Sequence, residues 1–154
     1  MSHDSEQKPV LYLDIDGVLL AKDPNKAYGV RLAIGAIDFI KYAVENFEVY
    51  WLTTHCPSGD GSRAVQAVNG YSEEDLTPWL LKIGATTWGV RKTDAIDMHK
   101  PFLWFDDNCL YSEKAVLKEA NCANSWIEVD LQNYPDQMVH DKELLSSFID
   151  DSDE

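Results

Sequence analysis

The sequence is poor in cysteine and has no long apolar run. Its three cysteines, Cys56, Cys109 and Cys122, form no CxxC pair and no Cys/His set with the spacing of a zinc site. An odd number of irregularly spaced cysteines argues against a disulfide framework and predicts a reducing compartment. No apolar run approaches the roughly 20 residues that a helix needs to span a bilayer. We therefore expect a cytoplasmic protein with no membrane partner.

Positive charge is also scarce. The chain has 13 lysines and arginines against 27 acidic residues, which gives a formal net charge of -14. The basic residues form no run, and such a negative field does not attract nucleic acid or anionic lipid. A nucleic-acid partner is therefore disfavoured, although a local basic patch would still allow one.

The 154 residues predict a single domain, with a core over about 9–130 and a flexible acidic C-terminal tail. Apolar patterning predicts strands at 10–14, 48–52, 102–105 and 125–129. It predicts helices over 30–47, 63–68, a segment that begins at Ser72 and ends at Gly84, and one over 112–120, with a loop at 19–28. This alternation predicts an α/β sandwich with a mainly parallel central sheet.

Polar residues follow three of the predicted strands. They are Asp14 and Asp16, then Thr53 and Thr54, then Asp106 and Asp107. Because parallel strands end at one edge of the sheet, we expect these side chains to gather there, where ligands of open α/β sheets bind. Two carboxylates about 4 Å apart repel by about 4 kcal/mol at an effective dielectric of about 20. A divalent ion would relieve this repulsion, and an all-oxygen ligand set together with a phosphate suits Mg²⁺.

These stretches resemble the four motifs of the haloacid dehalogenase (HAD) superfamily. The "DIDGVL" stretch after the first strand resembles motif I, and Thr53 resembles motif II. Lys92 resembles the motif III lysine, with Lys100 as its rival, and the pair of acids in "LWFDDN" resembles motif IV. The resemblance covers about residues 10–129 and implies a Rossmann-like, three-layer HAD fold.

The resemblance also implies roles for these residues. Asp14 would be the nucleophile that forms an aspartyl-phosphate, and Asp16 the general acid and base. Mg²⁺ would be held by Asp14, by the backbone carbonyl of Asp16, and by motif IV, where Asp107 is favoured over Asp106.

Thr53, with Thr54 as the alternative, and Lys92 would bind the phosphoryl oxygens. His55 also lies close enough in sequence to reach the site. The expected activity is a Mg²⁺-dependent phosphomonoester hydrolase.

The segments between the motifs are too short for a large cap domain, so the resemblance implies a capless or minimally capped member. Such an open site is compatible with a phosphorylated macromolecule or with a small phosphorylated metabolite. Two other functions stay open. One is a HAD-like binding or regulatory module without activity, and the other is a phosphatase that acts on nucleic-acid ends.

Overall fold

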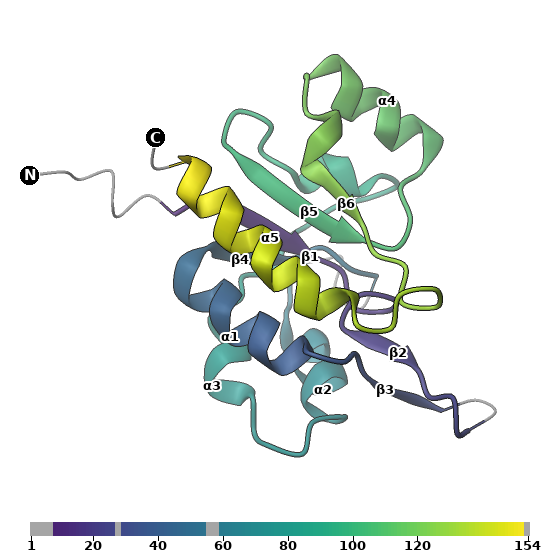
Figure 1. The fold of residues 1–154 in the computed structure, drawn as a ribbon. Coiled ribbons are helices and arrows are strands. Elements are labelled where there is room, and N and C mark those ends of the chain that lie inside the picture. Colours follow the sequence, from purple (N-terminus) through teal and green to yellow (C-terminus); the bar gives the residue numbers. More distant parts are fainter. Residues whose placement is uncertain (1–7, 27–28, 55–58, 153–154) are drawn as a thin grey trace, which may run out of the picture.

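The computed structural model describes residues 8–26, 29–54 and 59–152. Its centre is a four-stranded parallel sheet with the strand order β4-β1-β5-β6 (Figure 1). The strands are β1 (Val10–Leu13), β4 (Glu48–Trp51), β5 (Phe102–Asp106) and β6 (Trp126–Glu128). The predicted α/β fold with a parallel sheet is thus confirmed. Three strands lie within the segments predicted for them, and β5 extends one residue beyond its segment, to Asp106.

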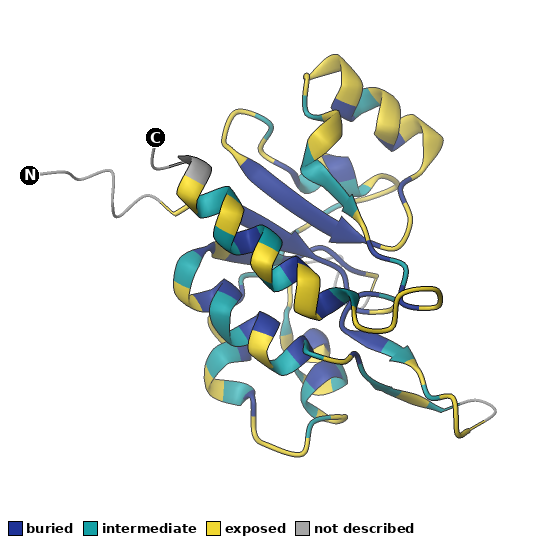
Figure 2. Cartoon of the chain, in the orientation of Figure 1, coloured by how far each residue is buried: buried dark blue, intermediate teal, exposed yellow. Residues whose placement is uncertain are grey.

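Strand β1 is buried on both faces. Leu11 and Leu13 belong to one apolar cluster, whereas Val10 and Tyr12 belong to a second. Successive side chains of a strand point to opposite faces, so these two clusters lie on opposite sides of the sheet. Figure 2 shows the central strands buried along their length. A continuous apolar run is therefore the correct pattern for this strand.

Helices cover both faces of the sheet. On one face α1 (Ala36–Asn46) packs against α5 (Gln137–Ser152) (Figure 1). On the other face α4 (Tyr111–Glu119) contributes the buried Leu117. The short helices α2 (Ser62–Asn69) and α3 (Thr77–Leu80) and the 3₁₀ segments η2 (Lys92–Ala95) and η3 (Ala123–Ser125) complete the set. Within the described residues, no helix combines the length and apolarity that crossing a membrane requires.

The core extends past residue 130, the limit expected from the sequence. Met138 and Leu145 of α5 are fully buried in the cluster beneath α1. The Phe148 ring stacks on Phe47 at a centroid distance of 6.1 Å. The acidic end of the chain, expected to be flexible, continues this helix as far as Ser152. Its apolar residues recur at helical spacing and bury one side of it.

Four local predictions were wrong. The predicted loop at 19–28 begins a hairpin in which β2 (Leu20–Lys22) pairs antiparallel with β3 (Val30–Leu32). The helix predicted from residue 30 begins only at Ala36, because Gly35 adopts a positive φ of 79°.

The remaining two concern helix starts. The helix predicted from Ser72 is limited to α3, since the Asp75 carboxylate accepts a hydrogen bond from the Thr77 N–H and Pro78 follows in the first turn. The helix predicted over 112–120 begins one residue earlier, at Tyr111.

Candidate functional site

Asp14 directly follows β1 and is held by the backbone around it. Its N–H donates to the Phe105 carbonyl at 3.1 Å, which continues the pairing of β1 with β5. Its Oδ1 accepts the Ile15 N–H at 2.8 Å. Because these bonds fix one oxygen and the main chain, Oδ2 is the atom that faces the other charged groups of the site.

Lys92 joins the acids of two neighbouring strands. Its Nζ lies 2.7 Å from Asp106 Oδ2 and 3.2 Å from Asp14 Oδ2. The three side chains are only 13%, 2% and 11% exposed, respectively. Lys100, the rival candidate, is exposed and lies at the other end of the sheet, near the beginning of β1. Of the two lysines, Lys92 is therefore the one that reaches Asp14.

A third carboxylate completes the cluster. Asp14, Asp106 and Asp107 each place one oxygen so that all three lie within 4.8 Å of one another. Asp107 is exposed, and its side chain lies against Gly17. A Cβ on Gly17 would clash with the Asp107 carboxylate, and the φ of 80° at Gly17 disfavours any side chain. The glycine of the "DIDG" stretch therefore allows the first loop to approach the acids that follow β5.

The charges within this cluster do not balance. Burial raises the pKa of Asp106 to about 8, and the charge of Asp14 adds to this effect while the Lys92 ammonium opposes it. Burial lowers the pKa of Lys92, but the charges of Asp14 and Asp106 outweigh burial and raise it overall. One lysine thus does not neutralise the buried acids, and the cluster favours a further positive charge.

The other predicted residues lie around this cluster. Asp16 is exposed at the mouth and does not belong to the three-carboxylate group. Thr53 is fully buried and follows Leu52, whose N–H donates to the carbonyl of Leu13. Thr54 is exposed. Thr53 thus follows the strand next to Asp14 and is enclosed, whereas Thr54 faces outward. His55 and Cys56 lie outside the described residues.

Glu113 was not identified from the sequence. It is buried in the first turn of α4, where its Oε2 accepts the Lys92 N–H at 2.6 Å and its Oε1 accepts the Leu110 N–H at 2.9 Å. Its carboxylate therefore connects the segment that carries Lys92 to the loop that follows Asp107. The local signal was a glutamate three residues after the N-cap residue, Leu110, which is a common capping position. That position reveals the bond to Leu110 but not the bond to Lys92.

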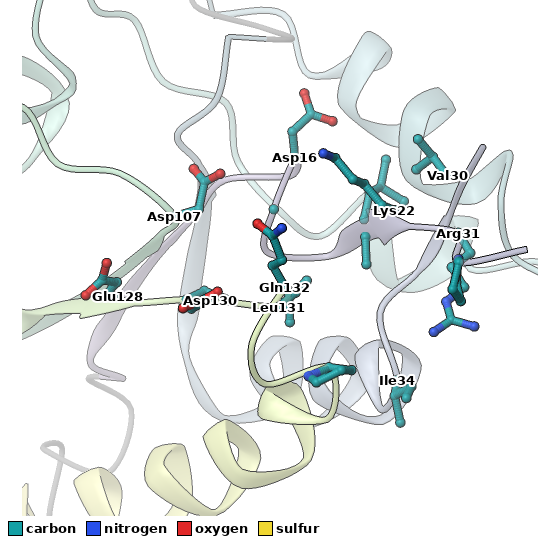
Figure 3. A pocket seen from close by; sticks show the side chains of 16 residues that line it. Asp16, Lys22, Val30, Arg31, Ile34, Asp107, Glu128, Asp130, Leu131 and Gln132 are labelled. Carbon is teal, nitrogen blue, oxygen red and sulfur yellow. The ribbon is translucent and has the colours of Figure 1, made fainter. Parts of the chain in front are cut away.

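A groove of about 610 Å³ opens beside the acids (Figure 3). Asp16 and Asp107 lie at one end of it. The β2–β3 hairpin forms one wall, and residues 128–132, from the last residue of β6 into the connection to α5, form the other. The size suits a small ligand.

The comparisons with known proteins add no family to these observations. No protein-family model matches the sequence, and no curated protein matches it. The parallel sheet and the acids at its edge define an α/β protein with a candidate metal and phosphate site. The HAD resemblance rests on the motifs themselves.

Proposed function

We propose that this chain is a Mg²⁺-dependent phosphomonoester hydrolase with a HAD-like, three-layer fold. The observation that carries the proposal is the contact of one partly buried ammonium, that of Lys92, with both Asp14 and Asp106. Asp14 and Asp106 follow or end adjacent parallel strands, at the edge where ligands of open α/β sheets bind. Phosphoryl transfer requires mainly positioning and neutralisation of charge, and this edge supplies groups for both.

The residues present fit a magnesium ion. The cluster offers only carboxylate oxygens, which are hard ligands, and it favours an additional positive charge. Asp14 and Asp107, with the backbone carbonyl of Asp16, would hold the ion. Asp106 is engaged by Lys92, which supports Asp107 as the direct ligand. When bound, Mg²⁺ would neutralise charge on the phosphate and so let an anionic nucleophile approach it.

The residues of the site would have separate roles in the two steps of the reaction. An Asp14 carboxylate oxygen attacks phosphorus, the bond from phosphorus to the ester oxygen breaks, and Asp16 donates its proton to the departing alkoxide. Asp16, now a carboxylate, accepts a proton from a water molecule whose oxygen attacks the same phosphorus. The bond to Asp14 breaks, which releases inorganic phosphate and restores both acids. Lys92 and Thr53 hold the phosphoryl oxygens during both steps.

The direct test is hydrolysis of p-nitrophenyl phosphate by the full chain with Mg²⁺, with other divalent ions, and with a chelator. We expect hydrolysis that needs the metal ion and is abolished by Asp14→Asn. Asp38→Asn, an exposed acid on α1, is the matched control and should keep the wild-type rate. Mass spectrometry of acid-quenched protein should find phosphate on Asp14.

Two outcomes would overturn the proposal. A wild-type chain that is inactive with every divalent ion, yet binds phosphate, would indicate the binding or regulatory module. Activity that survives Asp14→Asn would remove Asp14 as the nucleophile. The net charge of -14 still argues against nucleic-acid ends as substrates, and phosphorylated oligonucleotides added to the same assay test this point.

A further inference from the structure

The groove beside the acids has an apolar floor. Leu20 and Leu131 are buried at its base, while Val30 and Ile34 line it and stay partly exposed. A phosphate held at Asp14 would place its ester oxygen near the end of the groove marked by Asp16. The groove is therefore positioned to receive the group that the phosphate leaves, and the carbon skeleton of that group can lie on the apolar floor.

The two walls of the groove carry opposite charges (Figure 3). Glu128, the last residue of β6, and Asp130 just after it lie on one wall, and Lys22 and Arg31 lie on the hairpin. The Lys22 ammonium points toward the end of the groove that holds Asp16, whereas the Arg31 guanidinium points away from that end. Among the residues that the structure describes, neither Lys22 nor Glu128 has an ion-pair partner. One cation and one carboxylate thus face the groove from opposite sides.

We propose that the groove binds a zwitterionic leaving group, an alcohol of the amino-acid type that carries both an ammonium and a carboxylate. The proposal rests on the phosphatase activity above and specifies its substrate class. The ammonium would lie toward Glu128 and Asp130, and the carboxylate toward Lys22. A leaving group with only one charge satisfies only one wall, and a purely anionic one also meets the excess of acids at the mouth.

This charge pattern also distinguishes a free small molecule from a phosphopeptide. In a peptide, the α-ammonium and the α-carboxylate of a phosphorylated residue have become uncharged amides. Neither wall of the groove would then meet a group of opposite charge on the substrate. The proposal therefore commits to a small metabolite, and a phosphoserine residue blocked at both ends should behave as an uncharged substrate.

The test is a set of phosphomonoesters that differ in the charge of the leaving group. O-Phosphoserine carries both charges, 2-aminoethyl phosphate only the ammonium, carboxymethyl phosphate only the carboxylate, and ethyl phosphate neither. We expect kcat/KM to be highest for O-phosphoserine. Each missing charge should lower it about two- to fivefold, the range that partly exposed ion pairs provide.

Two variants test which wall of the groove is responsible for each part of the charge preference. Lys22→Gln should remove the advantage of a carboxylate, and Glu128→Gln should remove that of an ammonium. The readout is the kcat/KM of each charged ester divided by that of ethyl phosphate in the same variant, so that a general loss of activity cancels. Lys118→Gln and Glu119→Gln, which are exposed on α4 away from the groove, are the matched controls and should keep the wild-type ratios.

The outcomes separate this proposal from the one before it. Hydrolysis without a charge preference, or with a preference that neither variant changes, would refute the proposal of a zwitterionic leaving group. It would leave the proposed phosphatase activity intact. If no ester is hydrolysed, p-nitrophenyl phosphate included, the phosphatase fails and calorimetric titration with the same four esters tests the groove. Tightest binding of O-phosphoserine would then support the groove. Equal affinities, or no binding, would overturn it.

Discussion

Removal of the Glu113 carboxylate should destabilise the fold more than any exposed charge does. The side chain lies in a residue that is only 3% exposed. Its two oxygens accept backbone N–H groups from two separate segments, that of Lys92 at 2.6 Å and that of Leu110 at 2.9 Å. Glu113→Ala deletes both acceptors at once. The segment that carries Lys92 then loses its connection to α4.

The size of the effect follows from these two bonds. A backbone N–H that loses its acceptor in a buried site costs about 1–3 kcal/mol. Two such groups in Glu113→Ala give a loss of about 2–6 kcal/mol, a large share of the roughly 5–15 kcal/mol that stabilises a typical domain. Glu113→Gln keeps one acceptor oxygen at nearly the same volume. We expect it to lose about 1–2 kcal/mol, since only one bond is lost.

Urea unfolding followed by tryptophan fluorescence measures this difference. Both variants should shift the midpoint without changing the slope, because the surface exposed on unfolding stays the same. Glu119→Ala, an exposed glutamate at the end of the same helix, is the control and should stay within about 0.5 kcal/mol of wild type. If Glu113→Ala behaved like this control, the carboxylate would not hold the two segments together.

Two further predictions concern buried charges. Lys92→Met leaves the buried Asp14 and Asp106 without their counter-charge and should cost about 3–5 kcal/mol at neutral pH in chelator. The exposed Lys100→Met should cost less than about 0.5 kcal/mol in the same urea titration, and an equal loss in both would refute the assignment. Burial raises the pKa of Asp141 to about 6, above its unfolded value of about 3.9, so its stabilising effect is complete below pH 3.9 and is lost as the pH rises through 6. Asp141→Asn should therefore be more stable than wild type by about 1–3 kcal/mol at pH 7.5 but not at pH 4, and a pH-independent difference would contradict this reasoning.

The strands of the sheet were predictable because their signal is local. Each lies in a short apolar run, and β1 in particular is apolar at every position, as burial on both faces requires. The acids after β1 and at the end of β5 could be placed together from sequence, since parallel register alone brings Asp14 beside Asp106. Lys92 could be proposed as a phosphate-binding residue only from the family resemblance. Only the three-dimensional fold shows that Lys92, and not Lys100, reaches Asp14.

The features that were missed depend on contacts distant in sequence. Strands β2 and β3 have three residues each, too few for a period-2 pattern to stand out, and they are defined by pairing with each other. The local sequence pattern shows Glu113 only as a residue near the start of a helix. Its hydrogen bond to Lys92 spans 21 positions, so a local pattern does not reveal it. The groove is formed by the hairpin and the segment after β6, which are about a hundred residues apart in the chain.

The residues proposed for catalysis and those proposed for substrate selection lie in different parts of the fold. The acids and Lys92 lie at the ends of the central strands, where burial and register hold them in place. Of the charges proposed to select the leaving group, Lys22 lies on the hairpin and Glu128 is the exposed last residue of the edge strand β6, with Asp130 just beyond it. Because exposed side chains accept substitution at little cost to stability, the groove can change its charge pattern while the site stays intact. Substitutions at Lys22 and Glu128 should therefore alter which ester is preferred far more than they alter the free energy of unfolding.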